Sequence, residues 1–200
     1  DAIVHGLVHD PKTNRVTGVR VIDARTQAAT TYSARVVFLC ASAIASAQIL
    51  LNSASERHPA GLANGSGAVG RYLMDHLWGM FTVAAMPGPA DRHHSGRRPN
   101  GFYIPRYQNL RADEGEHLRG FGFQGSVLRA NWKTPAPGTP AIGAAYKDGV
   151  RRPGPWTLTL AGFGEMLPRA QNRVSLHPTR RDQWGIPLVH IECELGENER

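Results

Sequence analysis

The residues whose types most suggest chemistry are Asp75 and His76, an adjacent carboxylate and imidazole. Such a pair acts in hydrolases that carry a nucleophilic serine on a Gly-x-Ser-x-Gly turn, and the sequence has no such turn. Adjacent side chains on one extended backbone also point apart. We therefore interpret Asp75 and His76 as a pair that fixes its own loop.

His93 and His94 are the second candidate, because histidine is a common metal ligand. They stand in a polar loop with no third ligand at metal spacing. A zinc site needs at least three protein ligands, so we predict no metal here.

Phe123, Gln124 and Trp132 combine aromatic stacking surface with an amide that can bind sugar hydroxyl groups. These types are typical of a substrate-binding surface. Aromatic residues in the core of a strand explain most of the same pattern, so both interpretations stay open. Nearby, Glu165 interrupts an apolar run; we expect it to be buried and paired with Arg173.

The elements that position these residues begin with residues 36–40, an unbroken apolar run that predicts a strand buried on both faces. Ala41, Ser42 and Ala43 follow, and an apolar turn at residues 48–51 predicts a helix starting within residues 43–47. Small residues at a helix N-terminus let a ligand approach unpaired N–H groups. A close packing corner between helix and sheet explains this turn equally well. Cys40 and Cys193 lie far apart in sequence, and we expect two buried free thiols.

Ala2 to Asp10 and Val16 to Asp23 predict a hairpin, with a third strand near residues 30–32. Beyond residue 76, short apolar or alternating runs predict an antiparallel sheet, with residues 134–155 as one of its connectors. The expected domains are residues 1–76, 77–185 and 186–200, the last returning toward the first. Residues 65–70 and 120–125 both spell Gly-x-Gly-x-x-Gly, but neither lies between a strand and a helix, so we predict no dinucleotide loop there.

Two stretches resemble the glucose–methanol–choline oxidoreductases, flavoenzymes that oxidise alcohols and sugars. Residues 34–53, followed by Val69-Gly-Arg-Tyr-Leu-Met-Asp-His76, are similar to the family's strand, its Ser-Pro-Gln-Leu-Leu-Leu helix and its Val-Gly-Arg-Asn-Leu-Met-Asp-His loop. Residues 164–187 resemble the family's late strands. Cys-Ala-Ser-Ala and Leu-Leu-Asn-Ser look closest to the sugar-oxidising, pyranose-oxidase-like branch.

The resemblance implies an α/β FAD-binding domain of Rossmann-like fold, followed by an α+β domain whose antiparallel sheet binds substrate. It implies FAD as cofactor, touched by Val4, Ala41, Ser42 and Ala43, and a sugar or alcohol as substrate. Ser42 and Ala47 depart from the family's usual Gly and Pro. No dinucleotide Gly-rich loop precedes the strand, and the family's catalytic histidine segment is not matched, so we assign no catalytic residue. We expect a middle portion of a longer enzyme, with the remainder of its own polypeptide as partner.

The net charge of +7 and the pI near 10 suggest an alternative, a basic module that binds nucleic acid or another polyanion without catalysis. The basic pairs at residues 97–98, 151–152 and 180–181 are spread through connectors, so we expect no nucleic-acid partner. No apolar run reaches the length of a membrane span, and the compartment stays open.

Overall fold

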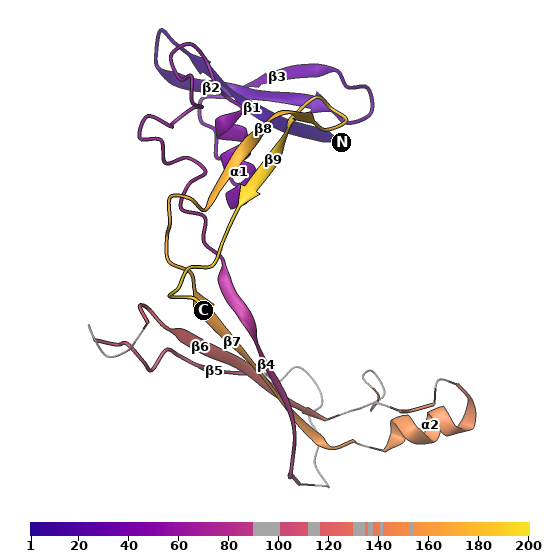
Figure 1. The fold of residues 1–200 in the computed structure, drawn as a ribbon. Coiled ribbons are helices and arrows are strands. Elements are labelled where there is room, and N and C mark those ends of the chain that lie inside the picture. The colour runs from indigo at the N-terminus through magenta and orange to yellow at the C-terminus, as the bar shows by residue number, and fades with distance from the viewer. Residues whose placement is uncertain (90–100, 112–116, 130–134, 136–137, 141, 153) are drawn as a thin grey trace. The chain divides into compact units, whose positions relative to one another are not determined.

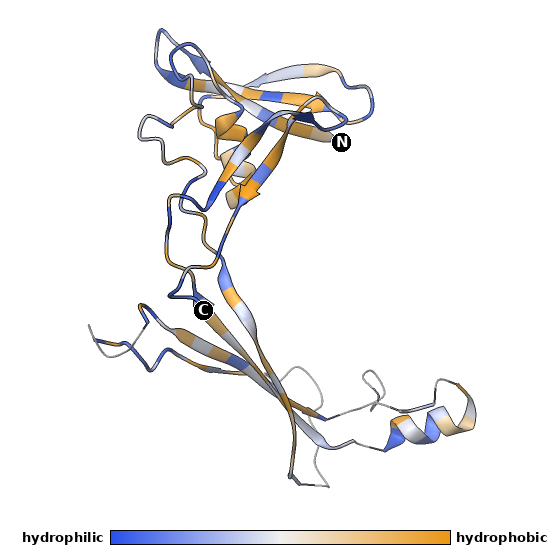
Figure 2. Ribbon diagram, in the orientation of Figure 1, coloured by the Kyte–Doolittle hydropathy of each residue, from blue (hydrophilic) through white to orange (hydrophobic). Residues whose placement is uncertain are grey.

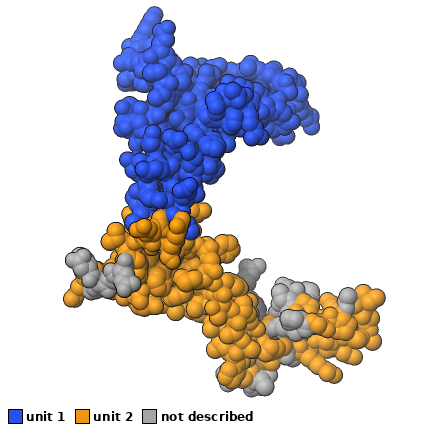
Figure 3. Space-filling model, viewed as in Figure 1, with its two compact units in different colours: residues 1–74, 167–195 blue, residues 75–166, 196–200 orange. Residues whose placement is uncertain are grey.

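The computed structural model describes residues 1–89, 101–111, 117–129, 135, 138–140, 142–152 and 154–200. The chain divides into two compact units, which Figure 3 shows in different colours. Unit 1 comprises residues 1–74 and 167–195, and unit 2 comprises residues 75–166 and 196–200.

Unit 1 opens with an antiparallel sheet of β1 (Ala2–Asp10), β2 (Arg15–Asp23) and β3 (Ala29–Ser33), in that order (Figure 1). The predicted hairpin and third strand are therefore confirmed. Carboxylates organise both turns: Asp10 accepts from the hydroxyl of Thr13 and Asp23 from the N–H of Thr26. The hydrogen bonds from Thr26 and then Arg25 lower the pKa of Asp23, as expected for a carboxylate that caps a turn.

The helix α1 (Ala43–Leu51) packs on β1 and begins where the sequence predicts. Its buried Ile49 forms the core of unit 1 with Leu7 and Leu62, and Figure 2 shows the hydrophobic colouring of this helix. Ser53 ties the helix to the sheet, because its Oγ accepts from Leu7 N–H at 2.8 Å and donates to Ile49 O at 2.6 Å. These two hydrogen bonds offset the free-energy cost of burying the Ser53 hydroxyl.

The prediction of a central strand at Val36–Cys40 is wrong, because these residues form no strand in the structure. Val37 and Leu39 pack against the core, whereas Val36 and Phe38 are 65% and 85% exposed. Every strand pair among the described residues is antiparallel. A buried strand needs backbone partners on its edges, and none of the described strands pairs with this segment.

Unit 1 is completed by β8 (Arg173–Arg181) and β9 (Pro187–Glu192), which pair with each other. The loop before unit 2 runs along β8: Val174 donates to Gly70 O at 2.7 Å and Leu73 donates to Asn172 O at 2.9 Å. Arg173 pairs with Glu192 across this two-stranded sheet. The expected pair of Arg173 with Glu165 is therefore wrong.

Unit 2 is an antiparallel sheet in the order β4-β7-β6-β5 (Figure 1). Its strands are β4 (His76–Met86), β5 (Gly101–Ile104), β6 (Phe121–Arg129) and β7 (Trp156–Glu165). Glu165 is exposed at the end of β7 and bonds Arg119 at 3.1 Å. Burial was expected because its neighbours are apolar, but the alternation of a strand turns its side chain outward.

The connector expected at residues 134–155 contains the short helix α2 (Gly143–Arg151). It has no buried residue, and Figure 2 shows a ribbon that mixes hydrophilic, neutral and hydrophobic colours. Cys40 and Cys193 are free, as expected, but exposed rather than buried. No helix among the described residues is long and apolar enough to cross a membrane.

Candidate functional site

The turn before α1 is the part of unit 1 best suited to hold a ligand. Ala41, Ser42 and Ala43 are all exposed, and no side chain caps the helix. The first N–H groups of a helix have no partner within the helix. Together with the positive end of the helix dipole they favour an anionic or electron-rich group. The small side chains leave that end open.

Ser42 stands in a backbone conformation that is normally reserved for glycine, with φ 72° and ψ 166°. Side chains rarely adopt this region because Cβ collides with the backbone, at a cost on the order of 1–3 kcal/mol. The strain is local to the turn that precedes the exposed N–H groups. Strain of this kind is typical of functional turns.

Val4, the other residue expected to touch a cofactor, lies in β1 opposite Val21 and is 39% exposed. It shares unit 1 with the α1 turn. The structure therefore leaves its side chain accessible.

At the other end of α1, Arg20, Asn52 and His5 form a polar cluster that the sequence analysis did not predict. Arg20 of β2 donates to the helix-terminal Asn52 O at 2.9 Å, and the Asn52 amide donates to His5 O at 2.7 Å. Burial lowers the pKa of His5, and the nearby Arg20 lowers it further. A cation at a helix C-terminus is favourable. Because Arg20 is distant in sequence, no local pattern indicated its role.

The sheet of unit 2 separates Phe123 from Gln124. Phe123 pairs with Gly162 of β7 and Gln124 with the next residue, Ala161, so their side chains lie on opposite faces. A ligand on one face contacts only one of them. Trp132, the third expected substrate residue, lies outside the described residues.

The face that carries Gln124 mixes exposed aromatic and polar side chains. Directly paired residues share a face, so the register places Phe81 and Tyr103 beside Ala161 and Gln124. Phe81 and Tyr103 are 60% and 61% exposed, and the next row contains Thr159 and Ser126. The Phe123 face carries mainly apolar residues, among them Met80, Phe102, Leu158 and Leu160. The chemistry of the two faces thus differs.

Asp75 and His76 behave as a local pair. The Asp75 carboxylate accepts from the backbone N–H of His76 at 2.7 Å, and the His76 ring contacts Phe163 edge-on. The described residues contain no group of three or more His, Cys, Asp or Glu that could hold a metal ion. His93 and His94 lie outside those residues.

Comparison of the sequence with known proteins finds one matching family model and two similar dehydrogenases. Residues 1–78 match the family model described as GMC oxidoreductase. The chain is 30% identical to the 2-methyl-1,2-propanediol dehydrogenase of Mycolicibacterium austroafricanum, over 94% of this chain and 34% of that protein. It is 28% identical to the fructose dehydrogenase large subunit of Gluconobacter japonicus, over 100% of this chain and 36% of that protein. These matches support a relationship between this chain and the GMC oxidoreductase family.

Two residues with positive φ stand where this chain departs from the GMC pattern. Ser42 replaces the usual GMC glycine, and Tyr72 stands where the pattern has asparagine; their φ angles are 72° and 59°. Glycine and asparagine are the residues that best tolerate positive φ. At both positions the backbone conformation is one that the residue of the GMC pattern tolerates better than the residue present here.

The matches support an oxidoreductase, and the GMC N-terminal domain is an FAD-binding Rossmann-like fold in general. The chain spans about a third of the length of these two relatives.

Proposed function

We propose that this chain is part of an FAD-dependent oxidoreductase that acts on CH–OH groups of sugars or other alcohols by hydride transfer to flavin. The observation that carries the proposal is the uncapped turn at Ala41–Ala43, held in a glycine-like conformation within the residues that match the GMC model. A basic polyanion-binding module would not need such a turn.

The residues of this turn fit an FAD site. Ala41, Ser42 and Ala43 would hold the cofactor through backbone groups, with Val4 as a further contact in β1. When bound, FAD supplies the acceptor for the hydride. The role of this chain is to bind and orient, since the redox chemistry belongs to the cofactor. No residue of the chain is proposed as the catalytic base.

In the proposed domain assignment, residues 1–76 belong to the FAD-binding part and residues 77–185 to the substrate-binding part. Residues 186–200 lead back toward the FAD-binding part. Because β8 pairs with β9 inside unit 1, we extend the FAD-binding part to residues 167–195. The substrate part is then the four-stranded sheet of unit 2. We further propose that the remainder of the polypeptide supplies the base and the rest of the cofactor site.

The proposed substrate is a hydroxyl-rich molecule, and a sugar best fits the pyranose-oxidase-like resemblance. Two relatives are named for a branched diol and for fructose. Phe123 and Gln124 are alternative proposed contacts in the described sheet, because they lie on its opposite faces. The mixed face, with Gln124 beside Tyr103 and Phe81, supports Gln124 more strongly, because amide and aromatic groups together recognise sugars.

The test compares the 200-residue chain with the full polypeptide of its source. We expect the full polypeptide to be yellow with flavin and to reduce a dye when given a sugar or a diol. The chain alone should bind FAD weakly, because a few backbone contacts do not offset the cost of ordering a large ligand. A colourless full polypeptide would refute the flavoenzyme proposal, and a yellow, active short chain would refute the proposed need for the remainder.

A further inference from the structure

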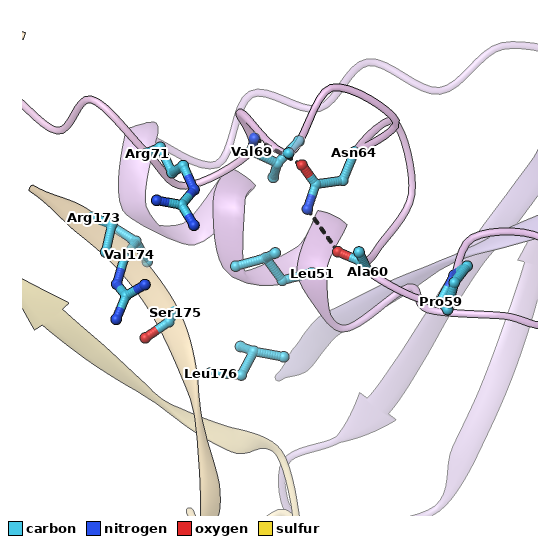
Figure 4. A pocket seen from close by; sticks show the side chains of 11 residues that line it. Leu51, Pro59, Ala60, Asn64, Val69, Arg71, Arg173, Val174, Ser175 and Leu176 are labelled. Carbon is cyan, nitrogen blue, oxygen red and sulfur yellow. Dashed lines mark hydrogen bonds between the residues drawn. The ribbon is translucent and has the colours of Figure 1, made fainter. Parts of the chain in front are cut away.

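A pocket of about 400 Å³ opens in unit 1 beside the C-terminal end of α1, between the loop at residues 59–71 and β8 (Figure 4). The loop at its rim is fixed by Asn64, whose amide donates to Ala60 O at 2.7 Å and whose oxygen accepts from Val69 N–H at 3.0 Å. Its other edge is joined to β8 by the bond from Val174 N–H to Gly70 O. The pocket is therefore held in shape by hydrogen bonds on both sides.

Two positive charges line the pocket, and the carboxylate of Glu192 lies against one of them from outside the lining. Arg71 and Arg173 are the charged residues among those lining it, and Figure 4 shows them approaching from the loop and from β8. Arg173 is oriented by Glu192, to which it donates through Nε. Arg71 is anchored through one Nη, which donates to Ala170 O at 3.2 Å.

Within the described part of the chain, both guanidinium groups keep donors that bond no other residue. An arginine has five N–H donors in a planar fork, and the bonds to Glu192 and Ala170 occupy one nitrogen of each. The hydroxyl of Ser175 lies on the same strand as Arg173, in the pocket lining. A planar anion with two oxygens matches this arrangement better than a single point acceptor.

The rest of the pocket lining is largely apolar. Leu51 and Leu176 project toward the space in Figure 4, with Val69 and Val174 nearby. A ligand that fits both parts has an anionic head and a short apolar body. A volume of about 400 Å³ is within the range of small-molecule sites.

We propose that this pocket binds a short-chain monocarboxylate, with its carboxylate on Arg71 and Arg173 and its alkyl chain on the leucine wall. The site is separate from the α1 turn and does not rest on the proposed oxidoreductase function. It makes the pocket a second ligand site in the unit that contains the proposed FAD contacts.

The test titrates the 200-residue chain with hexanoate and follows the NMR resonances of Leu51, Leu176 and Ser175. We expect saturable shifts, and binding weakened about tenfold or more in Arg71→Gln and in Arg173→Gln, because each loses a charge-assisted hydrogen bond. Arg180→Gln removes the same charge from an exposed position of β8 outside the pocket and should bind hexanoate as the parent does.

Three further probes separate the two halves of the site. Acetate keeps the carboxylate but lacks the longer alkyl chain, and 1-hexanol keeps the alkyl chain but lacks the charge. Inorganic phosphate is an anion with no alkyl chain. We expect all three to bind more weakly than hexanoate. Arg173→Lys, which keeps the charge but not the fork, should restore part of the affinity lost in Arg173→Gln. Equal weakening in Arg180→Gln, tight binding of 1-hexanol or phosphate, or shifts that do not saturate would overturn the proposal.

Discussion

At the scale of single residues, the chain retains a backbone conformation that its own side chain opposes. Ser42 has φ 72° and ψ 166°, a region of backbone conformation that only glycine adopts without strain. The turn is exposed, so packing around the Ser42 side chain does not enforce this conformation. The strain must be overcome by the elements on either side, namely the packed Val37 and Leu39 before it and α1 after it.

Replacing Ser42 by glycine is therefore expected to stabilise the chain by about 1 kcal/mol, the strain relieved less the extra freedom of glycine in the unfolded state. Urea unfolding measures this change. The matched control is Ser46→Gly inside α1, which should destabilise by about 0.5 kcal/mol because glycine is a poor helix former. A loss of stability in Ser42→Gly would show that the turn is not strained.

His5 supplies a prediction for pH. Its folded pKa lies below the usual 6.5 through burial and Arg20, so the folded state favours the neutral ring. The unfolded chain then binds more protons in this range, and stability is lost as pH falls from above 6.5 toward the folded pKa. Arg20→Met should raise the His5 pKa in an NMR titration of the imidazole. Arg15→Met, at an exposed position of the same strand, should leave it unchanged; equal shifts in both variants would contradict the assignment.

At the scale of elements, the sheet of unit 2 relies on glycines that cross-strand side chains cover. Tyr103 lies over Gly122, and Phe102 over Gly125. A Cβ at Gly125 would meet Phe102 at 2.4 Å and the backbone oxygen of Thr159 at 2.6 Å. Bare backbone in β6 thus makes room for the aromatic residues of β5.

Gly125→Ala should cost about 2 kcal/mol, because the backbone oxygen of Thr159 cannot move as a side chain can. Gly79→Ala in β4 is the control, since nothing lies within 4 Å of its Cβ position, and its effect should stay within about 0.5 kcal/mol. Thermal unfolding followed by circular dichroism compares the two. Similar melting temperatures for both variants would argue against the covered-glycine account.

The sequence predicted those elements that depend on neighbouring residues. The hairpin and the start of α1 follow from turn residues and local apolar pattern, which act over a few positions. The sequence interpretation grouped Phe123 and Gln124 on one surface, although strand alternation alone separates them. The partner of Glu165 was not predictable, since Arg119 reaches it from a different part of the chain. Nor was α2, which has no buried residue and whose flanks are rich in Pro and Gly.

At the scale of the whole molecule, the failed strand at residues 36–40 is itself informative. One side of the segment packs through Val37 and Leu39, while Val36, Phe38 and Cys40 are exposed. Exposed large apolar groups beside a free backbone edge favour pairing with another strand. Because the chain spans about a third of its relatives, the proposed partner for this edge is the remainder of the same polypeptide.

Cys40 makes this arrangement measurable, since its thiol is exposed in this chain, as is that of Cys193. A maleimide should label both thiols readily in the 200-residue chain. In the full polypeptide a covering strand would require local opening before Cys40 reacts, slowing its labelling by at least about tenfold. Urea-unfolded full polypeptide, in which both thiols should react at the rate of free cysteine, controls for reagent and sequence effects. Equal Cys40 labelling rates in the folded short chain and the folded full polypeptide would show that no other strand covers residues 36–40.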